Sequence, residues 1–299
     1  MALRGAVYVN GIITPAAEAA IPVYDHGFLF GEGVYEVVRT YNGALFLFEP
    51  HMRRLRQSAA LIHLDVPFDD ATLLKWIDET RAAAGEMREA YVRILLTRGV
   101  GDTTYDVNAT PAPSLVIIVK PVDEPAPRIA ERGINIALVP IVRNHPRSVN
   151  PVIKSNNLLN NALAMQEAHR RGGEEALLCN YRGEIAECAQ SNFFMVRDGV
   201  VLTPPSEAGL LEGITREYLF EVGKDVGIEV RAQVLYPEDL GTAAEAFITS
   251  TTRELSPVTS IDGKPVGDGT VGEITKKMLA GYRRRAQELT LSGADAVRS

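Results

Sequence analysis

An α+β architecture with two domains is the fold class that the sequence predicts. Three observations favour it. The chain has 299 residues, roughly twice the length of an average domain. Short apolar runs flank turn-forming dipeptides, as antiparallel hairpins require, and amphipathic helical segments interrupt these runs. A proline-rich stretch at residues 120–127 divides the chain and predicts a linker.

Asn-Gly and Asp-Gly dipeptides mark the expected hairpins. They supply the positive φ angles that two-residue turns need. Each lies between short apolar runs, so we expect adjacent antiparallel strands and not a series of βαβ units. Arg182-Gly183 is a further candidate turn. The four dipeptides are Asn10-Gly11, Asn42-Gly43, Asp198-Gly199 and Asp262-Gly263.

Apolar residues at helical spacing predict five helices between these hairpins. We expect a small N-terminal α/β domain over residues 1–120, a linker over 121–127 and a larger domain over 128–299. The predicted helices cover residues 49–63, 70–84, 156–171, 215–227 and 272–289.

Composition and charge exclude several classes of function. Hydrophobic residues make up 46% of the chain and charged residues 23%, as in soluble globular proteins. The formal net charge of −7 argues against electrostatic binding of nucleic acid or anionic lipid. The two cysteines fit neither a zinc site nor a disulfide framework, so we expect no metal and a reducing, cytoplasmic compartment. No run of about 18 apolar residues predicts a membrane span.

Lys154 is the first candidate for chemistry. It follows the apolar residues Val152 and Ile153, and Ser155 after it is a plausible N-cap of the helix predicted over 156–171. A helix N-terminus and burial both disfavour an ammonium ion, and a neutral amine forms Schiff bases with carbonyls. On the pattern alone, an exposed lysine beside a helix is the simpler alternative.

Glu187 and three anion-binding candidates complete the set. Alternation along the strand places Glu187 on the same face as Ile185, so its carboxylate would need a partner if buried; a solvated loop glutamate is the simpler alternative. Thr215 lies where residues 211–216 lead into a helix, and four consecutive hydroxyls occupy 249–252. Arg54 would add positive charge. Each of these signals is weak alone.

Taken in order, these segments resemble the fold-type IV pyridoxal 5′-phosphate enzymes, the branched-chain and D-amino acid aminotransferases. The resemblance runs through nearly the whole chain. It is carried by residues 25–36, 51–55, 91–93, 153–161, 187–193, 213–216, 249–257 and 268–275.

The resemblance implies a cofactor, a fold and a set of roles. The cofactor, pyridoxal 5′-phosphate, lies between a small N-terminal α/β domain and a larger barrel-like domain. Lys154 carries it as an internal aldimine and moves the proton between Cα and C4′, and Glu187 pairs with its pyridine nitrogen. The implied phosphate ligands are Arg54, Ile214, Thr215 and Thr251. Amino donors and 2-oxo acids react in a ping-pong sequence.

The resemblance also implies an assembly. Members of the family are homodimers or larger, and loops of the neighbouring subunit line the site. This gives the long loop at residues 99–112 an expected role in substrate specificity.

The candidate substrate residues do not all match one branch of the family. Tyr91 and Arg93 match a Tyr-x-Arg pair that lies near substrate carboxylates in the branched-chain enzymes, whereas Thr103 and Tyr105 replace the Arg-x-His trap of the D-amino acid enzymes. Further candidates for substrate contact are Tyr35, Thr252 and Arg253.

Two other features depart from the pattern of the branched-chain enzymes. Leu158-Leu159 after the lysine is typical of the D-amino acid enzymes, and Arg253 stands where most relatives have a small residue. We favour a branched-chain L-amino acid donor with 2-oxoglutarate as acceptor. A transaminase for D-amino acids or (R)-amines is the alternative, and an aminodeoxychorismate-type lyase the second. A cofactor-binding protein without catalysis is disfavoured by the presence of all four residues Lys154, Glu187, Arg54 and Thr215.

Overall fold

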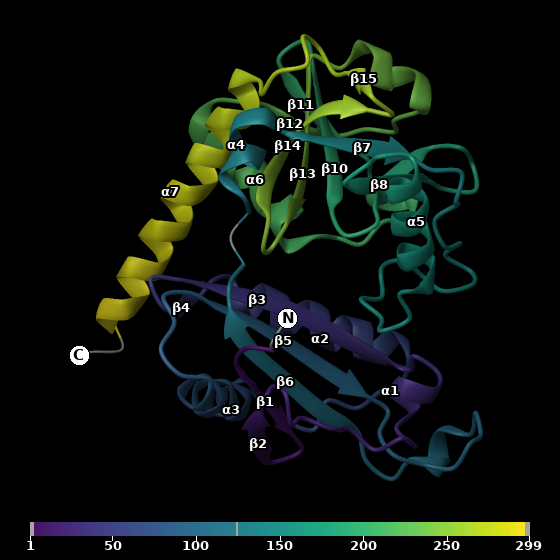
Figure 1. The fold of residues 1–299 in the computed structure, drawn as a ribbon, viewed down its shortest axis with the longest axis vertical. Helices are drawn as coiled ribbons and strands as arrows, with labels where there is room; N and C mark the ends of the chain where they lie inside the picture. The colour runs from purple at the N-terminus through teal and green to yellow at the C-terminus, as the bar shows by residue number, and fades with distance from the viewer. Residues whose placement is uncertain (1–2, 124, 297–299) are drawn as a thin grey trace. The chain divides into compact units, whose positions relative to one another are not determined.

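The chain folds into two compact units, each of which is defined by the contacts among its own residues. The structure is a computed structural model that describes residues 3–123 and 125–296. Unit 1 comprises the described residues up to Asp123, the segment Ile153–Leu158 and the described residues from Leu289 onward; unit 2 comprises the described residues between Asp123 and Ile153 together with Leu159–Glu288. The secondary structure is α+β, as predicted (Figure 1).

Unit 1 is built on a six-stranded antiparallel sheet with the order β2-β1-β6-β5-β3-β4. Helices α2 (Phe48–Leu61) and α3 (Asp70–Ala83) pack on it, and α1 (His26–Leu29) is a single turn before β3. The strands are β1 (Ala6–Val9), β2 (Ile12–Pro15), β3 (Gly33–Tyr41), β4 (Ala44–Leu45), β5 (Ala90–Thr97) and β6 (Ser114–Pro121).

Strand alternation places one face of this sheet in the core of unit 1. Val34 and Val38 of β3 are buried together with Leu55 of α2 and Ile77 of α3. Successive side chains of a strand point to opposite faces, so the odd-numbered residues of β3, Tyr35 among them, lie on the other face. One face of the sheet therefore packs against α2 and α3 in the core, and the other face carries the side chain of Tyr35.

A segment distant in sequence completes the edge of β3. Strand β4 pairs only with the last two residues of β3 and leaves the start of β3 open. Residues 153–156 occupy that edge: the Tyr35 amide donates to the Lys154 carbonyl at 2.9 Å, and the Asn156 amide donates to the Gly33 carbonyl at 2.9 Å. Ile153 packs against the core of unit 1.

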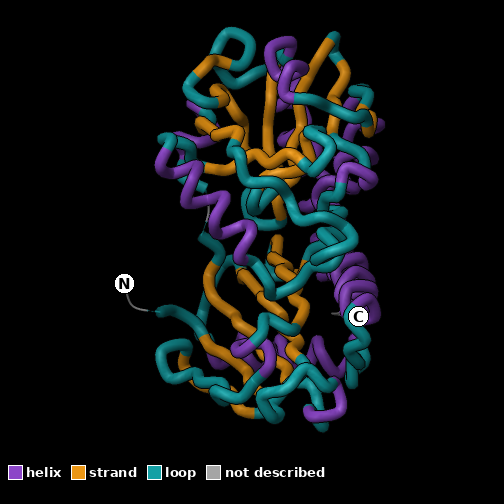
Figure 2. The backbone as a smooth tube through the Cα atoms, turned by 90° about the vertical axis from the view of Figure 1, so that its right-hand side faces the viewer, coloured by secondary structure: helices purple, strands orange, loops and turns teal. Residues whose placement is uncertain are grey.

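Unit 2 contains a nine-stranded sheet whose strands follow a curved surface (Figure 2). The order is β12-β11-β10-β13-β14-β7-β8-β9, with β15 paired to β14. The strands are β7 (Ile134–Leu138), β8 (Glu175–Cys179), β9 (Ile185–Cys188), β10 (Asn192–Arg197), β11 (Val200–Thr203), β12 (Val230–Ala232), β13 (Glu245–Ser250), β14 (Glu254–Ile261) and β15 (Lys264–Pro265).

Helices accompany the sheet of unit 2. Helix α5 contacts β7 and β8, and α6 contacts β12 and β13. Phe194 and Phe247 stack in the interior with ring centroids 4.9 Å apart. The helices are α4 (Pro127–Arg132), α5 (Leu159–Arg170), α6 (Ile214–Val226) and α7 (Glu273–Ala296), the last of which continues beyond Glu288.

The predicted hairpins are confirmed. Asn10, Asn42, Asp198 and Asp262 all have φ between 46° and 53°, and a positive-φ glycine follows each of them. The strands that flank the predicted turns of unit 2 pair antiparallel, as expected. The turn signals did not predict three parallel pairs of the same sheet, β7 with β8, β11 with β12 and β14 with β7. Helices α5 and α6 form the crossovers of two of these pairs, so each of them belongs to a βαβ unit.

The five predicted helices correspond to α2, α3, α5, α6 and α7, with shifted ends. The largest shift is at the end of α7, which is predicted at residue 289 and lies at Ala296. Helix α5 is predicted from residue 156 and begins at Leu159. Ser155 is therefore not its N-cap; the Ser155 hydroxyl instead accepts a hydrogen bond from the Asn157 amide at 3.0 Å.

The two units differ from the predicted domains at the segment that contains Lys154. The sequence predicts that residues 128–299 carry Lys154, but the contacts of Ile153–Leu158 group Lys154 with unit 1. The reason is the open edge of β3, which takes its partner from this segment.

None of the helices in the described part of the chain combines the length and the apolar character needed to cross a bilayer.

Two leucines of α2 test the packing of unit 1. Leu55 is 1% exposed and Leu61 is 51% exposed. We expect Leu55→Ala to lower the free energy of unfolding by about 2–5 kcal/mol, because it leaves a cavity in the core. The matched control Leu61→Ala should change it by no more than about 0.5 kcal/mol. Urea denaturation followed by circular dichroism measures both, and equal losses would contradict the assigned packing.

Candidate functional site

Lys154 is fixed by its backbone on unit 1. Its carbonyl accepts from Tyr35 on β3, and its amide donates to the Ser58 hydroxyl of α2 at 3.1 Å. The Nζ atom lies 4.6 Å from the centre of the Tyr35 ring. The lysine is thus held by a strand edge and a helix, and its position does not depend on a helix N-terminus.

Arg93 lies against the same tyrosine. Its guanidinium carbon is 4.0 Å from the centre of the Tyr35 ring, in a cation–π contact. Arg93 is on β5, where it pairs with Val37 of β3. Tyr91, two residues earlier, contacts Lys120 instead, whose Nζ is 5.2 Å from the ring centre. The structure therefore brings Lys154, Tyr35 and Arg93 together and places Tyr91 farther along the same strand.

A buried carboxylate organises the helix beside Lys154. Glu36 of β3 is fully buried and accepts from Arg54 Nε at 2.6 Å and Arg54 Nη2 at 2.9 Å. His51 Nδ1 lies 2.7 Å from Oε2 of the same carboxylate. Arg54 and His51 are one turn apart on α2, so both reach Glu36 from one helix face.

Charge in this cluster is balanced by the ion pair. Burial alone would raise the pKa of Glu36, but Arg54 and His51 outweigh it and hold that pKa well below its usual range. Burial lowers the pKa of His51, against the opposing effect of Glu36. The cluster is therefore a carboxylate, a guanidinium and a neutral imidazole that donates from Nδ1.

Glu187 of unit 2 is buried and surrounded by donors. Arg143 Nε donates to Oε1 at 2.9 Å, the Leu211 amide donates to Oε2 at 3.1 Å, and Asn192 Nδ2 lies 3.3 Å from Oε2. The side chains of Arg143 and Glu187 are 8% and 6% exposed. These donors suit a negatively charged carboxylate. Glu187 is buried, but the predicted alternation with Ile185 is wrong. All four residues of β9 are buried, and a register shift pairs Ile185 with Cys179 and Glu187 with Leu178, two neighbours on β8 that point to opposite faces.

Asn192 connects the predicted residues of unit 2. Its Nδ2 also donates to the Leu211 carbonyl at 2.9 Å, and Asn192 pairs across the sheet with Thr249 of β13. A Cβ at Gly213 would lie 1.9 Å from Asn192 Oδ1, so a larger residue there would displace the Asn192 side chain. Sequence reasoning gave no role to Asn192 or Arg143, since neither belongs to a periodic pattern or a turn.

The start of α6 is suited to an anion. Gly213 is its N-cap and supplies no side-chain acceptor, so the first-turn amides, including that of Ile214, have no side-chain cap. Thr215 in the same turn is buried. Thr249 Oγ1 is buried without a hydrogen-bond partner among the described residues. Uncapped amides and buried hydroxyls are the donors that a phosphate group requires.

The predicted substrate residues Thr252 and Arg253 lie in the turn between β13 and β14, after Thr251. Arg253 Nη1 donates to Glu175 Oε2 at 2.7 Å, and its Nη2 is 3.2 Å from Gln190 Oε1. Burial raises the pKa of Glu175, while Arg253 opposes that shift. Arg253 is thus engaged in an ion pair with a buried carboxylate of β8.

Comparisons with known proteins agree with this arrangement. A sequence profile described as amino-transferase class IV matches residues 33–261. The chain belongs to the class IV aminotransferases. Members of this family use pyridoxal 5′-phosphate, and the enzyme is a fold-type IV transaminase.

Individual relatives carry the names of two activities. A Methanocaldococcus jannaschii protein, named provisionally as a branched-chain-amino-acid aminotransferase, is 38% identical over 93% of this chain and 95% of its own length. A D-alanine aminotransferase of Listeria innocua is 38% identical over 91% and 93%. The crystal structure of the branched-chain aminotransferase from Thermoproteus uzoniensis with norvaline has a TM-score of 0.87, with 33% identity and 95% of each chain covered.

The residues present fit this cofactor. An amine suits its aldehyde, a buried carboxylate suits its pyridine nitrogen, and the uncapped amides of α6 suit its phosphate. Among the described residues, no group of three or more His, Cys, Asp or Glu side chains is placed to hold a metal ion.

Glu36→Gln tests the buried cluster of unit 1. At pH 7 we expect it to lower the free energy of unfolding by about 3–5 kcal/mol, because it leaves Arg54 without its buried partner. The folded-state pKa of Glu36 is depressed from 4.5, so the wild-type contribution is present above that pH and is lost as the pH falls below it.

The stability difference between the two proteins should therefore shrink by about 1.4 kcal/mol per pH unit below the unfolded-state pKa. Urea titrations between about pH 3 and pH 7 measure it, a range that spans the unfolded-state pKa of glutamate. Glu79→Gln, at an exposed residue of α3, is the control and should show no such trend. A constant difference across this range would contradict the ionised pair.

Proposed function

We propose that this aminotransferase moves the amino group of branched-chain L-amino acids to a 2-oxo acid such as 2-oxoglutarate, in a ping-pong sequence. The observation that carries the proposal is the position of Lys154, whose backbone is fixed on β3 and α2 and whose amine lies over Tyr35. A catalytic amine has to meet its reaction partner in a defined geometry, and this double attachment provides one.

The chain's residues have distinct proposed roles. When bound, pyridoxal 5′-phosphate supplies a ring that accepts the electrons released at the substrate Cα. Lys154 holds the cofactor and moves the proton at Cα through Nζ. Glu187, kept in place by Arg143, pairs with the pyridine nitrogen. The proposed phosphate ligands are Arg54, Ile214, Thr215 and Thr251.

Two observations support a carboxylate-binding role for Arg93. It lies against the same ring as Lys154, and its guanidinium carbon is 4.0 Å from the centre of that ring, a contact that restricts the position of the guanidinium. A planar, pre-oriented guanidinium binds a carboxylate through two parallel hydrogen bonds. Tyr35, Tyr91, Thr252 and Arg253 remain proposed substrate contacts. Arg253 is already paired with Glu175. To bind a substrate as well, it would have to use the edge of its guanidinium that faces away from Glu175.

The D-amino acid alternative has support of its own. The relatives named for D-alanine and for branched-chain amino acids are equally identical to this chain, at 38%. Against it, Thr103 and Tyr105 carry no positive charge where a carboxylate trap is expected. The lyase alternative has no relative among those described above. A transaminase for D-amino acids or (R)-amines is therefore the second candidate.

We also propose that the protein is at least a homodimer, in which the loop at 99–112 helps to select the substrate. Large apolar side chains are exposed on unit 1 at 21–28 and 100–107, two segments that a bridge between Asp25 and Val100 joins. Exposed apolar groups of this kind are typical of contact surfaces. We also propose a cytoplasmic location for the protein, because both of its cysteines are free thiols.

Separate half-reactions distinguish the donor classes. Purified holoenzyme is mixed with L-leucine, D-alanine or (R)-1-phenylethylamine, and the cofactor's absorption spectrum is recorded. We expect L-leucine to convert the lysine-bound form to the pyridoxamine form, because the proposed carboxylate contact is that of the L-specific enzymes. Conversion by D-alanine alone would select the alternative. Lys154→Ala should show no multiple turnover with any donor.

Arg93→Leu tests the carboxylate contact. Losing a charge-assisted hydrogen bond should raise the KM for 2-oxoglutarate about tenfold. The KM for 4-methyl-2-oxopentanoate, which has one carboxylate fewer, should rise less. Steady-state kinetics measure both constants, and Arg88→Leu, at an exposed arginine, is the control. An equal rise for the two acceptors would assign Arg93 a structural role.

A further inference from the structure

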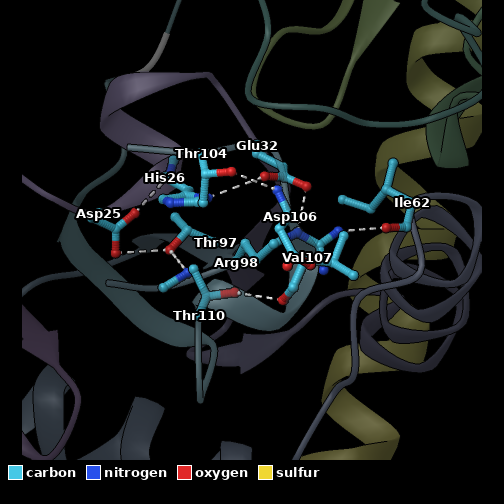
Figure 3. Close-up of polar contacts among 12 residues, drawn as sticks. Asp25, His26, Glu32, Ile62, Thr97, Arg98, Thr104, Asp106, Val107 and Thr110 are labelled. Atoms are coloured by element: carbon cyan, nitrogen blue, oxygen red, sulfur yellow. Dashed lines mark hydrogen bonds and ion pairs between the residues drawn. The ribbon is translucent and has the colours of Figure 1, made fainter. Parts of the chain in front are cut away.

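The loop between β5 and β6, residues 99–112, is ordered by contacts that do not involve the proposed catalytic residues. Its own hydrogen bonds make it compact, and in one of them the Asn108 amide donates to Asp106 Oδ1 at 2.9 Å. In another, the Thr110 hydroxyl donates to the Val107 carbonyl at 3.1 Å (Figure 3). These bonds lie within the loop. Its start is held by the backbone of α1, because the His26 amide donates to the Gly99 carbonyl at 2.9 Å.

Helix α1 is a fixed platform. Its N-cap Asp25 is buried, accepts from the Gly27 amide at 2.8 Å and accepts from the Thr97 hydroxyl of β5 at 2.9 Å. Glu32, just after α1, pairs with Arg98. Arg98 also donates to the Ile62 carbonyl at 2.6 Å, at the end of α2 (Figure 3). The turn is thus tied to both β5 and α2.

Two side chains of α1 and its cap reach the middle of the loop. His26 is 1% exposed, and its Nε2 lies 2.8 Å from the Asp102 carbonyl oxygen. Its Nδ1 is 3.5 Å from Glu32 Oε2. Phe30 packs edge-on to His26 with centroids 4.9 Å apart, and Tyr105 of the loop packs on Phe30 at 5.0 Å. A proton on Nε2 lets His26 donate to the carbonyl.

We propose that His26 and Phe30 are positioning residues that anchor the 99–112 loop, through Asp102 and Tyr105, and that this anchoring sets the affinity for substrate. The inference rests on the proposed function, in which this loop helps to select the substrate. Tyr105 is 88% exposed although its ring is held by Phe30. An exposed ring whose motion is restricted by such a contact offers contact area at a smaller entropy cost than a free ring does.

Hydrogen exchange measured by mass spectrometry tests the anchoring without substrate. The amides of Thr104, Asn108 and Ala109 are hydrogen-bonded in the loop and exchange when it opens. We expect His26→Leu to speed their exchange about tenfold, since it removes the bond to Asp102. His26→Gln, whose amide nitrogen can replace Nε2, should stay near the wild-type rate. His169→Leu, at an exposed histidine of α5, is the control.

Tyr105→Ala keeps the test decisive if His26→Leu fails to fold. It removes only an exposed ring and should also speed exchange of the loop. Both variants should raise KM for the amino donor while kcat stays within about twofold, because the chemistry at Lys154 is untouched. Unchanged exchange, or equal acceleration in His26→Gln, would overturn the anchor. Faster exchange with unchanged KM would overturn its link to substrate. Absence of transamination in the wild type would instead count against the proposed function.

Discussion

The position of Lys154 depends on the open edge of β3. A strand edge exposes amide and carbonyl groups that need partners, and β4 covers only the far end of β3. Residues 153–156 pair with the start of β3. The segment Ile153–Leu158 therefore belongs to unit 1, and the chain belongs to unit 2 again from Leu159. Backbone pairing of this kind fixes a residue more firmly than a side-chain contact, because two hydrogen bonds define both its position and its direction.

The same strand also organises the charges next to Lys154. Tyr35 and Glu36 are neighbours on β3 and point to opposite faces, so one strand carries both the ring under the lysine and the buried partner of Arg54. Replacing Glu36 would therefore disturb α2 as well as the charge balance. In unit 2, Asn192 has the corresponding role, because it contacts Glu187 and lies against Gly213 at the start of α6.

Local features of the fold could be predicted from the sequence, whereas long-range ones could not. Asn42-Gly43 specifies a turn by its backbone preference alone, and the helix over 70–84 follows from its spacing. The parallel pairs of unit 2 and the grouping of residues 153–158 with unit 1 depend on partners far away in sequence. The burial of Glu187 follows from the burial of the whole of β9 and not from alternation, which a register shift interrupts. Its partner Arg143 is 44 residues away and has no local signal in the sequence.

Substrate choice illustrates the same limit within the site. Lys154, Glu187 and the start of α6 are the parts of the chain that we propose to hold the cofactor. Every reaction of the family needs the cofactor, so motifs of this kind identify the chemistry and not the donor. Specificity depends on side chains whose neighbours are not specified by short motifs. Arg253 shows this: its unusual place after Thr252 suggested a substrate contact, yet the buried carboxylate that it meets, Glu175, is 78 residues away. A charge already neutralised in this way attracts a second carboxylate weakly. Arg93, whose guanidinium lies on an uncharged ring, keeps that capacity.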